Sequence, residues 1–346
     1  MEQVVGQSDT GDEQLRAEPE NLPLRLGIVA IGRNEGERLM ACLRSMPSNV
    51  PVVYVDSGST DGSAEKAAQL TDAVVELDMR IPFSAGRARK EGFEKLIHLY
   101  PDLDAVHFFD GDTMVEAGWL RAATEFLQGN PNFAAVAGRR RERFPEASWY
   151  NRMCDSEWDT PVGEANAVGG DALYRRSAFE AAEGFDPNFV CGEEPELCFR
   201  LRQAGHKVMR LGHDMTLHDA AITTFSGYWK RAVRSGYAWT LGALKHGKSG
   251  YNVKEALRAA LWGAGLPILA LGLLVFGFGF AALLVIALYP IKFIRLRSRF
   301  RNAGEAQAGR RAATLMLVNA AEARGLQKAL FAAWRGEHKI LEYKSS

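Results

Sequence analysis

The chain has few of the residues and segments that mark several large classes of protein. Its 346 residues include only four cysteines, Cys42, Cys154, Cys191 and Cys198, and no two of them have the spacing of a zinc site. Such scattered thiols argue against a disulfide framework and are typical of a reducing compartment. The first 22 residues lack a basic start and an apolar run, so we expect no secretory signal peptide.

The formal net charge is zero, because 42 Lys and Arg residues balance 42 Asp and Glu residues. A nucleic-acid partner is therefore not expected. The charges are nevertheless uneven: residues 1–20 carry six acids and one Arg, whereas residues 292–346 carry twelve basic and four acidic residues. We interpret residues 1–23 as a disordered acidic tail and residues 293–346 as a basic, amphipathic helical region.

Residues 24–250 are predicted to form one α/β domain. Short apolar runs predict buried strands at Leu26–Ile31, Pro51–Val55, Ala73–Leu77 and Ala105–Phe109. Helical spacing between and after them predicts helices at Glu35–Ser45, Ser63–Leu70, Ala85–Leu99 and Val115–Leu127. This alternation is typical of a Rossmann-like, mostly parallel sheet flanked by helices.

Beyond residue 130 the pattern loosens into loops and short elements. Helices are expected at Ser177–Ala182 and Glu194–Ala204, and a strand at Val208–Leu211. In parallel sheets, ligands bind at the carboxyl ends of the strands. Asn34, Asp56 and Asp110 each follow a predicted strand, so we expect these three polar side chains on one rim of the sheet.

Residues 259–291 contain no charged side chain. One straight helix of that length would be roughly 50 Å long, whereas the hydrocarbon core of a bilayer is about 30 Å thick. Both flanks are basic, which favours keeping both on the cytoplasmic side. We therefore predict a transmembrane or re-entrant hairpin over residues 256–292, with one tilted crossing as the alternative. A buried core helix does not fit this length.

Residues 305–335 have the spacing of an amphipathic helix, with Leu326, Leu330 and Trp334 on one face. Basic residues are interleaved with them, as in helices that lie at a membrane surface. Packing against the catalytic domain is an equal alternative.

The segment Asp110-Gly111-Asp112 places two carboxylates one residue apart after a strand. Mg²⁺ and Mn²⁺ prefer oxygen ligands and are commonly completed by substrate phosphates, so this pair could hold either ion. A plain turn at the end of a strand would use the same residue types.

Three further segments could carry chemistry. Asp56 opens a loop rich in Ser, Thr and Asp, where it could bind a base or a sugar hydroxyl while a neighbour caps the next helix. Glu193 and Glu194 begin a predicted helix, where the dipole favours acids but where one could also act as a general base. His218 follows a strand and could serve packing, a metal or a phosphate.

Taken in order, these features resemble the inverting family 2 glycosyltransferases with the GT-A fold. The likeness covers about residues 26–218. The segments that carry it are Asn34-Glu35, Asp56–Gly62, Ser84–Lys90, Asp110-Gly111-Asp112, Gly170–Arg176, Gly184–Asp186 and Gly192-Glu193-Glu194.

The resemblance implies roles for individual residues. Asp112 would bind the metal together with His218, and Glu194, beside Glu193, would be the general base. The remaining residues would bind the nucleotide-sugar: Asn34, Glu35, Asp56, Arg87, Asp110 and Gly170. Of these, Asp56 would contact the base and Asp110 the ribose.

Departures from the family pattern qualify these roles. Glu194 stands where the family more often has Asp, and Lys90 replaces a usual Asn. The Gln-x-x-Arg-Trp motif of processive synthases is absent, so transfer of one sugar is favoured.

The resemblance implies a nucleotide-sugar donor, Mg²⁺ or Mn²⁺, and a glycan or polyprenyl-linked acceptor in bacterial exopolysaccharide or cell-envelope synthesis. The enzyme would sit at the bacterial cytoplasmic (inner) membrane with its catalytic domain in the cytoplasm. Two rival functions stay open. The first is a nucleotidyltransferase, which would need a glycine-rich, basic loop after the first strand, whereas Ile31–Glu35 is short and acidic. The second is a membrane scaffold that keeps a catalytically decayed transferase domain.

Overall fold

The computed structural model describes residues 16–336, which form two compact units. The first comprises residues up to 144, 155–186 and 197–220, and the second comprises residues 145–154, 187–196 and those from 221 onward. The sequence predicted that the α/β domain extends to residue 250. In the structure, residues 221–250 belong to the second unit with the C-terminal helices.

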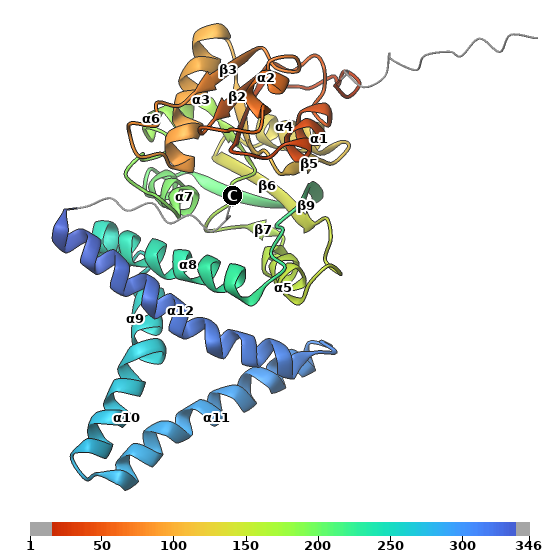
Figure 1. The fold of residues 1–346 in the computed structure, drawn as a ribbon. Coiled ribbons are helices and arrows are strands. Elements are labelled where there is room, and N and C mark those ends of the chain that lie inside the picture. The colour runs from red at the N-terminus through yellow and green to blue at the C-terminus, as the bar shows by residue number, and fades with distance from the viewer. Residues whose placement is uncertain (1–15, 337–346) are drawn as a thin grey trace, which may run out of the picture. The chain divides into compact units, whose positions relative to one another are not determined.

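The first unit is built on one mixed sheet (Figure 1). Its strands are β1 Leu26–Gly32, β2 Val52–Asp56, β3 Ala73–Glu76, β4 Ala105–Asp110, β5 Thr113–Val115, β6 Phe133–Glu142, β7 Gly163–Glu164, β8 Ala172–Arg175 and β9 Lys207–His218. Their order is β3-β2-β1-β4-β8-β6-β9-β5, and β7 pairs with β9. The first four strands in that order are parallel, and β8 joins β4 antiparallel. The expected Rossmann-like sheet is therefore confirmed.

Helices connect and flank these strands. They are α1 Glu37–Arg44, α2 Ser63–Ala67, α3 Ala85–Leu99, α4 Trp119–Gly129 and α6 Arg176–Ala181. Strand β1 and the first four residues of β2 are apolar and almost completely buried, which explains why the sequence predicted them as continuous apolar runs. Two more helices, α5 Trp149–Trp158 and α7 Glu193–Gln203, cross the boundary between the units.

Three expectations about the first unit need correction. Disorder was expected through residue 23, but Ala17 pairs with Pro47, and Arg16 donates to the Val50 carbonyl oxygen at 2.6 Å. The helix predicted from Val115 begins at Trp119, because residues 113–115 pair with β9 instead. The expected strand at Val208–Leu211 is the start of β9, which runs for 12 residues.

The second unit is helical. Its elements are α8 Phe225–His246, the short 3₁₀ helix Gly247–Ser249, α9 Val253–Ala260, the π-helical turn Leu261–Gly265, α10 Leu266–Val275, α11 Gly279–Asn302 and α12 Ala308–Arg335. The apolar stretch is divided between α10 and α11, which pack against each other as a hairpin (Figure 1). Gly277 makes the turn between them at φ +82°, a conformation that glycine adopts without strain.

The expected amphipathic C-terminal helix is present as α12, which packs along α8 and also contacts α11. Its neighbours are thus helices of its own unit. Helix α8 was not predicted from the sequence, although it is 22 residues long.

Candidate active site

Asp110, Asp112 and His218 meet where two strands of the first unit end. Asp110 is the last residue of β4, and Thr113, just after Asp112, pairs with His218 at the end of β9. One ligand atom from each of the three lies within 4.8 Å of the others, and His218 Nε2 is 3.3 Å from Asp112 Oδ1. Two carboxylates and one imidazole at this spacing can hold a divalent cation.

Asp110 is held by an arginine that the sequence analysis did not single out. Arg89 is 2% exposed, and its Nη2 lies 2.7 Å from Asp110 Oδ1. Burial alone would raise the pKa of Asp110, but the guanidinium groups of Arg89 and Arg140 outweigh burial and keep this pKa below its ordinary value. Asp110 is therefore ionised, which suits a metal or ribose ligand.

Arg87, which was predicted to bind the nucleotide-sugar, contacts other groups. Its Nε donates to Glu91 Oε1 at 2.7 Å, and its Nη1 donates to the carbonyl oxygens of Asp78 and Ile81. Residues 87 and 89 lie about 200° apart around helix α3, so only one of them can face Asp110. In this structure that residue is Arg89.

Gly170 lies against the Arg89–Asp110 pair. A Cβ atom at this position would be 2.6 Å from Arg89 Nη2 and 2.8 Å from Asp110 Oδ2. The absence of a side chain thus lets the backbone lie against the ion pair. Whether this backbone also contacts a nucleotide-sugar stays a prediction.

Asp171, the next residue, is fully buried and supports the same strand end. Its Oδ1 accepts the backbone N–H of Asp110 at 3.1 Å, and its Oδ2 accepts from the Thr216 hydroxyl and from Arg140 Nε, both at 3.0 Å. Burial raises the pKa of Asp171 to about 6, although Arg140 opposes the shift. Asp171 is a positioning group that sequence reasoning missed, since nothing in the sequence pairs it with Arg140.

Asp56 shapes the loop that follows β2. Its Oδ1 accepts from the Tyr54 hydroxyl at 3.0 Å and from the Ser59 hydroxyl, while its Oδ2 accepts the N–H groups of Gly58 and Ser59. The side chain is buried, so its carboxylate fixes the shape of this loop. Its predicted contact with a base stays a prediction.

Asn34 and Glu35 lie beside that loop. The Asn34 N–H donates to Ser59 Oγ at 2.9 Å, and Asn34 Oδ1 accepts the N–H of Thr60 at 2.8 Å. Glu35 is buried and forms an ion pair of 2.7 Å with Arg38. The rim that the sequence predicted from Asn34, Asp56 and Asp110 is therefore present at the carboxyl ends of β1, β2 and β4.

Glu193 and Glu194 belong to the second unit, where they begin α7. Glu193 is 3% exposed, whereas Glu194 is partly accessible. Accessibility favours Glu194 as the residue that could meet a substrate, and its role stays a prediction.

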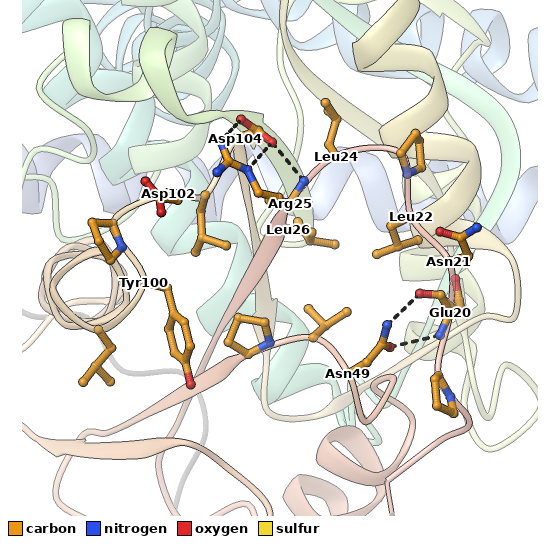
Figure 2. A pocket seen from close by; sticks show the side chains of 17 residues that line it. Glu20, Asn21, Leu22, Leu24, Arg25, Leu26, Asn49, Tyr100, Asp102 and Asp104 are labelled. Carbon is orange, nitrogen blue, oxygen red and sulfur yellow. Dashed lines mark hydrogen bonds and ion pairs between the residues drawn. The ribbon is translucent and has the colours of Figure 1, made fainter.

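A hollow of the first unit lies at the opposite edge of the sheet. Its volume is about 990 Å³. Figure 2 shows Leu22, Tyr100 and Asp102 among the residues that line it. Its walls include Leu26, the first residue of β1, and Asp104, which precedes β4 and pairs with Arg25. Ligands of parallel sheets bind at the carboxyl ends of strands, so size alone does not make this cavity the active site.

Comparisons with known proteins agree with this geometry. Residues 28–182 match the family described as Glycosyl transferase family 2. The succinoglycan biosynthesis protein ExoA of Rhizobium meliloti (strain 1021) is 28% identical over 194 residues, which cover 51% of this chain and only 57% of that relative.

Among solved structures, the mannosyltransferase PcManGT from Pyrobaculum calidifontis, in complex with GDP-Man and Mn²⁺, aligns with a TM-score of 0.57. The alignment covers 93% of this chain and 91% of that one, at 17% identity, so the likeness is one of fold. Residues 28–182, less than half of the chain, thus resemble the family 2 glycosyltransferases, and the chain shares the GT-A fold of the solved mannosyltransferase.

Proposed function

We propose that this enzyme transfers one sugar, with inversion, from a nucleotide-sugar to a glycan acceptor and that it requires a divalent metal ion, Mg²⁺ or Mn²⁺. The observation that carries this proposal is the group formed by Asp110, Asp112 and His218 at the end of β4. Asp112 and His218 are the metal ligands in this proposal, and Asp110, held by Arg89, serves the ribose or the same ion. A bound cation would supply neutralisation of the charge that builds on the departing diphosphate.

Glu194 is the proposed general base. It would take the proton from the acceptor hydroxyl as that oxygen attacks the anomeric carbon, while the nucleoside diphosphate leaves from the opposite side. Support comes from its accessibility at the start of α7, whereas the buried Glu193 would help to hold the helix start. Glu194→Gln should therefore retain donor binding and lose transfer.

The test is release of nucleoside diphosphate from a panel of nucleotide-sugars with Mn²⁺ or Mg²⁺. We expect Asp112→Asn to lower this rate by at least 100-fold, because one of the ligands that carry the proposed ion is lost. Asp102→Asn removes an exposed carboxylate at the other edge of the sheet and should retain full activity. Wild-type turnover in Asp112→Asn, or pyrophosphate as the released product, would reject the proposal.

We further propose that the α10–α11 hairpin enters the cytoplasmic membrane from the cytoplasmic side without crossing it. By length and composition, residues 253–275 and 279–302 are candidate membrane spans, and only 11% and 6% of their apolar windows are buried. A buried core helix would be covered, so that alternative does not fit. Large apolar side chains near the turn are exposed: Val275, Phe276, Phe278 and Phe280.

The base of the hairpin supports entry and exit on the same side. Arg258 Nη1 and Lys292 Nζ both donate to Asn319 Oδ1 on α12, at 3.2 and 3.1 Å. Close by, the Tyr289 hydroxyl donates to the carbonyl oxygen of Trp262, and such aromatic residues are typical of the membrane interface. From this level to the turn, each uncharged leg is roughly 20 Å long, short of the about 30 Å needed to cross.

Cysteine labelling tests this topology, because the four native cysteines are buried. An impermeant maleimide applied to intact cells should fail to label Gly277→Cys, which lies at the turn. The matched control, Ser249→Cys, lies on an exposed segment at the basic flank and should be labelled only after lysis. Labelling of Gly277→Cys from outside would instead indicate two complete crossings.

The proposed acceptor is lipid-linked, a polyprenyl-linked sugar in exopolysaccharide or cell-envelope synthesis. A hairpin in the inner leaflet would keep the enzyme beside such an acceptor, and the name of the ExoA relative points to the same process. Transfer to a polyprenyl-diphosphate-linked sugar should greatly exceed transfer to the free sugar. Equal rates with both would contradict this part of the proposal.

A further inference from the structure

A second hollow in the first unit lies next to the candidate metal ligands. Its volume is about 290 Å³, and its walls come from β6, the end of α5, the loop before β8 and β9. Ala137, Val168 and Met215 contribute apolar surface, while Arg140, Trp158 and Arg210 contribute charged or aromatic groups.

Two wall residues contact the candidate metal ligands directly. The indole of Trp158 meets the His218 ring nearly edge-on, with ring centroids 4.8 Å apart. Asp171 accepts the backbone N–H of Asp110. The hollow therefore adjoins the candidate metal site.

Arg210 gives independent evidence for a ligand. Arg210 is only 5% exposed, and its Nε has no hydrogen-bond partner within residues 16–336. The nearest carboxylate, that of Asp159, is 3.8 Å from Nη2. A buried donor without an acceptor is unfavourable, and an oxygen atom of a ligand in the hollow would satisfy it.

The lining also defines the chemical class of this ligand. Pockets for small molecules span about 300–1,000 Å³, so this one suits a single ring and not a nucleotide. Trp158 offers a flat apolar surface, with the Arg140 guanidinium stacked 5.5 Å from its ring. Arg140 is paired with Asp171, Asp159 lies near Arg210, and Glu157 also lines the hollow, so positive charge is not in excess.

We propose that this hollow binds the transferred sugar of the donor, that the sugar is an uncharged monosaccharide, and that Trp158 and Arg210 select it. The sugar's apolar face packs on the indole, and one of its oxygen atoms accepts from Arg210 Nε. This inference rests on the proposed function, because the sugar must arrive on a nucleoside diphosphate held at the neighbouring metal site.

The experiment compares binding of a nucleotide-sugar with binding of its nucleoside diphosphate alone. Calorimetry on the full-length protein with Mn²⁺ would use UDP, GDP, UDP-glucose, UDP-galactose, GDP-mannose and UDP-glucuronate. We expect Trp158→Ala to weaken the preferred nucleotide-sugar at least tenfold while changing the Kd of its nucleoside diphosphate less than twofold. Arg210→Met should show the same selective loss, and Trp334→Ala, at a residue 79% exposed on α12, should show none.

Unchanged diphosphate binding also demonstrates that each variant is folded. Equal weakening of both ligands, or of neither, would overturn the inference, as would a rise in KM for the acceptor alone. Preference of the wild type for UDP-glucuronate would overturn the uncharged class. If the wild type binds no diphosphate at all, the proposed function itself fails, and that failure is visible before any substitution is made.

Discussion

His107 shows how one residue couples stability to pH. It lies fully buried on β4, and its Nε2 accepts the Trp119 indole N–H at 2.8 Å. Because an indole can only donate, the His107 proton must be on Nδ1, where it meets the carbonyl oxygen of Phe108 at 2.9 Å. Burial lowers the pKa of His107 to about 3, so the folded protein holds a neutral imidazole.

The sign of the pH dependence follows from this. An unfolded histidine gains a proton near pH 6.5, whereas the folded one resists protonation until about pH 3. Stability from this residue is therefore complete above pH 6.5 and falls as the pH drops towards 3, by up to about 1.4 kcal/mol per pH unit. Denaturant unfolding between pH 7 and 5 should show this slope.

His107→Asn tests the assignment. The variant should be less stable at pH 7. Its free energy of unfolding should also fall less steeply as the pH drops, because about one proton fewer is taken up on unfolding. His98→Asn serves as the control, because His98 lies in the last turn of α3 and its side chain is exposed. An unchanged slope in His107→Asn would show that other groups cause the acid sensitivity.

At the residue scale, the sequence was most informative where chemistry follows directly from position along a strand. Asp110 and Asp112 lie at the end of β4, as the apolar run Ala105–Phe109 before them predicted. Arg89 and Asp171 were not found, because their importance depends on which face of α3 meets the sheet and on Arg140 approaching from β6. Neither relation leaves a local pattern in the sequence.

At the scale of elements, the crossing of α8 and α12 depends on two glycines. A Cβ atom at Gly325 would lie 2.0 Å from the Val233 carbonyl oxygen, and one at Gly236 would lie 2.0 Å from the Glu322 carbonyl oxygen. The helices therefore touch backbone to backbone, which no side chain would permit. This contact explains why α12 packs on α8 and why residues 221–250 join the second unit.

Gly325→Ala makes this a testable statement. Alanine is a better helix former than glycine by about 1 kcal/mol, so an open site would be stabilised. Here the clash should prevail, with a loss of about 1–3 kcal/mol measured as a lower Tm in detergent. Gly129→Ala, which has open space around its Cβ position, should not lower the Tm. A higher Tm for Gly325→Ala would contradict the packing.

Strand β6 was missed because four of its ten residues are glycine or alanine, which are depleted in strands. Three consecutive arginines follow Gly138 and give no apolar run. In the fold, those arginines meet carboxylates from elsewhere: Arg139 pairs with Asp155 at 2.9 Å, and Arg140 pairs with Asp171. Long-range ion pairs thus override the local preference.

At the scale of the whole molecule, a metal bound to the folded state alone should raise its stability. Ligand at 100 times its Kd adds about 2.7 kcal/mol to the free energy of unfolding. We expect Mn²⁺ to raise the Tm of the EDTA-treated protein and to have little effect on Asp112→Asn. The same Mn²⁺ shift in both proteins would mean that the ion binds elsewhere.

The sequence by itself determined the parallel half of the sheet, the rim of polar residues, the apolar hairpin and the resemblance to a family. These depend on local order: an apolar run is buried, and the residue after it lies at the edge. Tertiary structure alone decided that Asp171 supports the end of β4, that Arg89 and not Arg87 faces Asp110, and that α8 belongs with α12. Each of these rests on residues far apart in the chain, whose contacts are set by strand pairing and by how closely two backbones can approach.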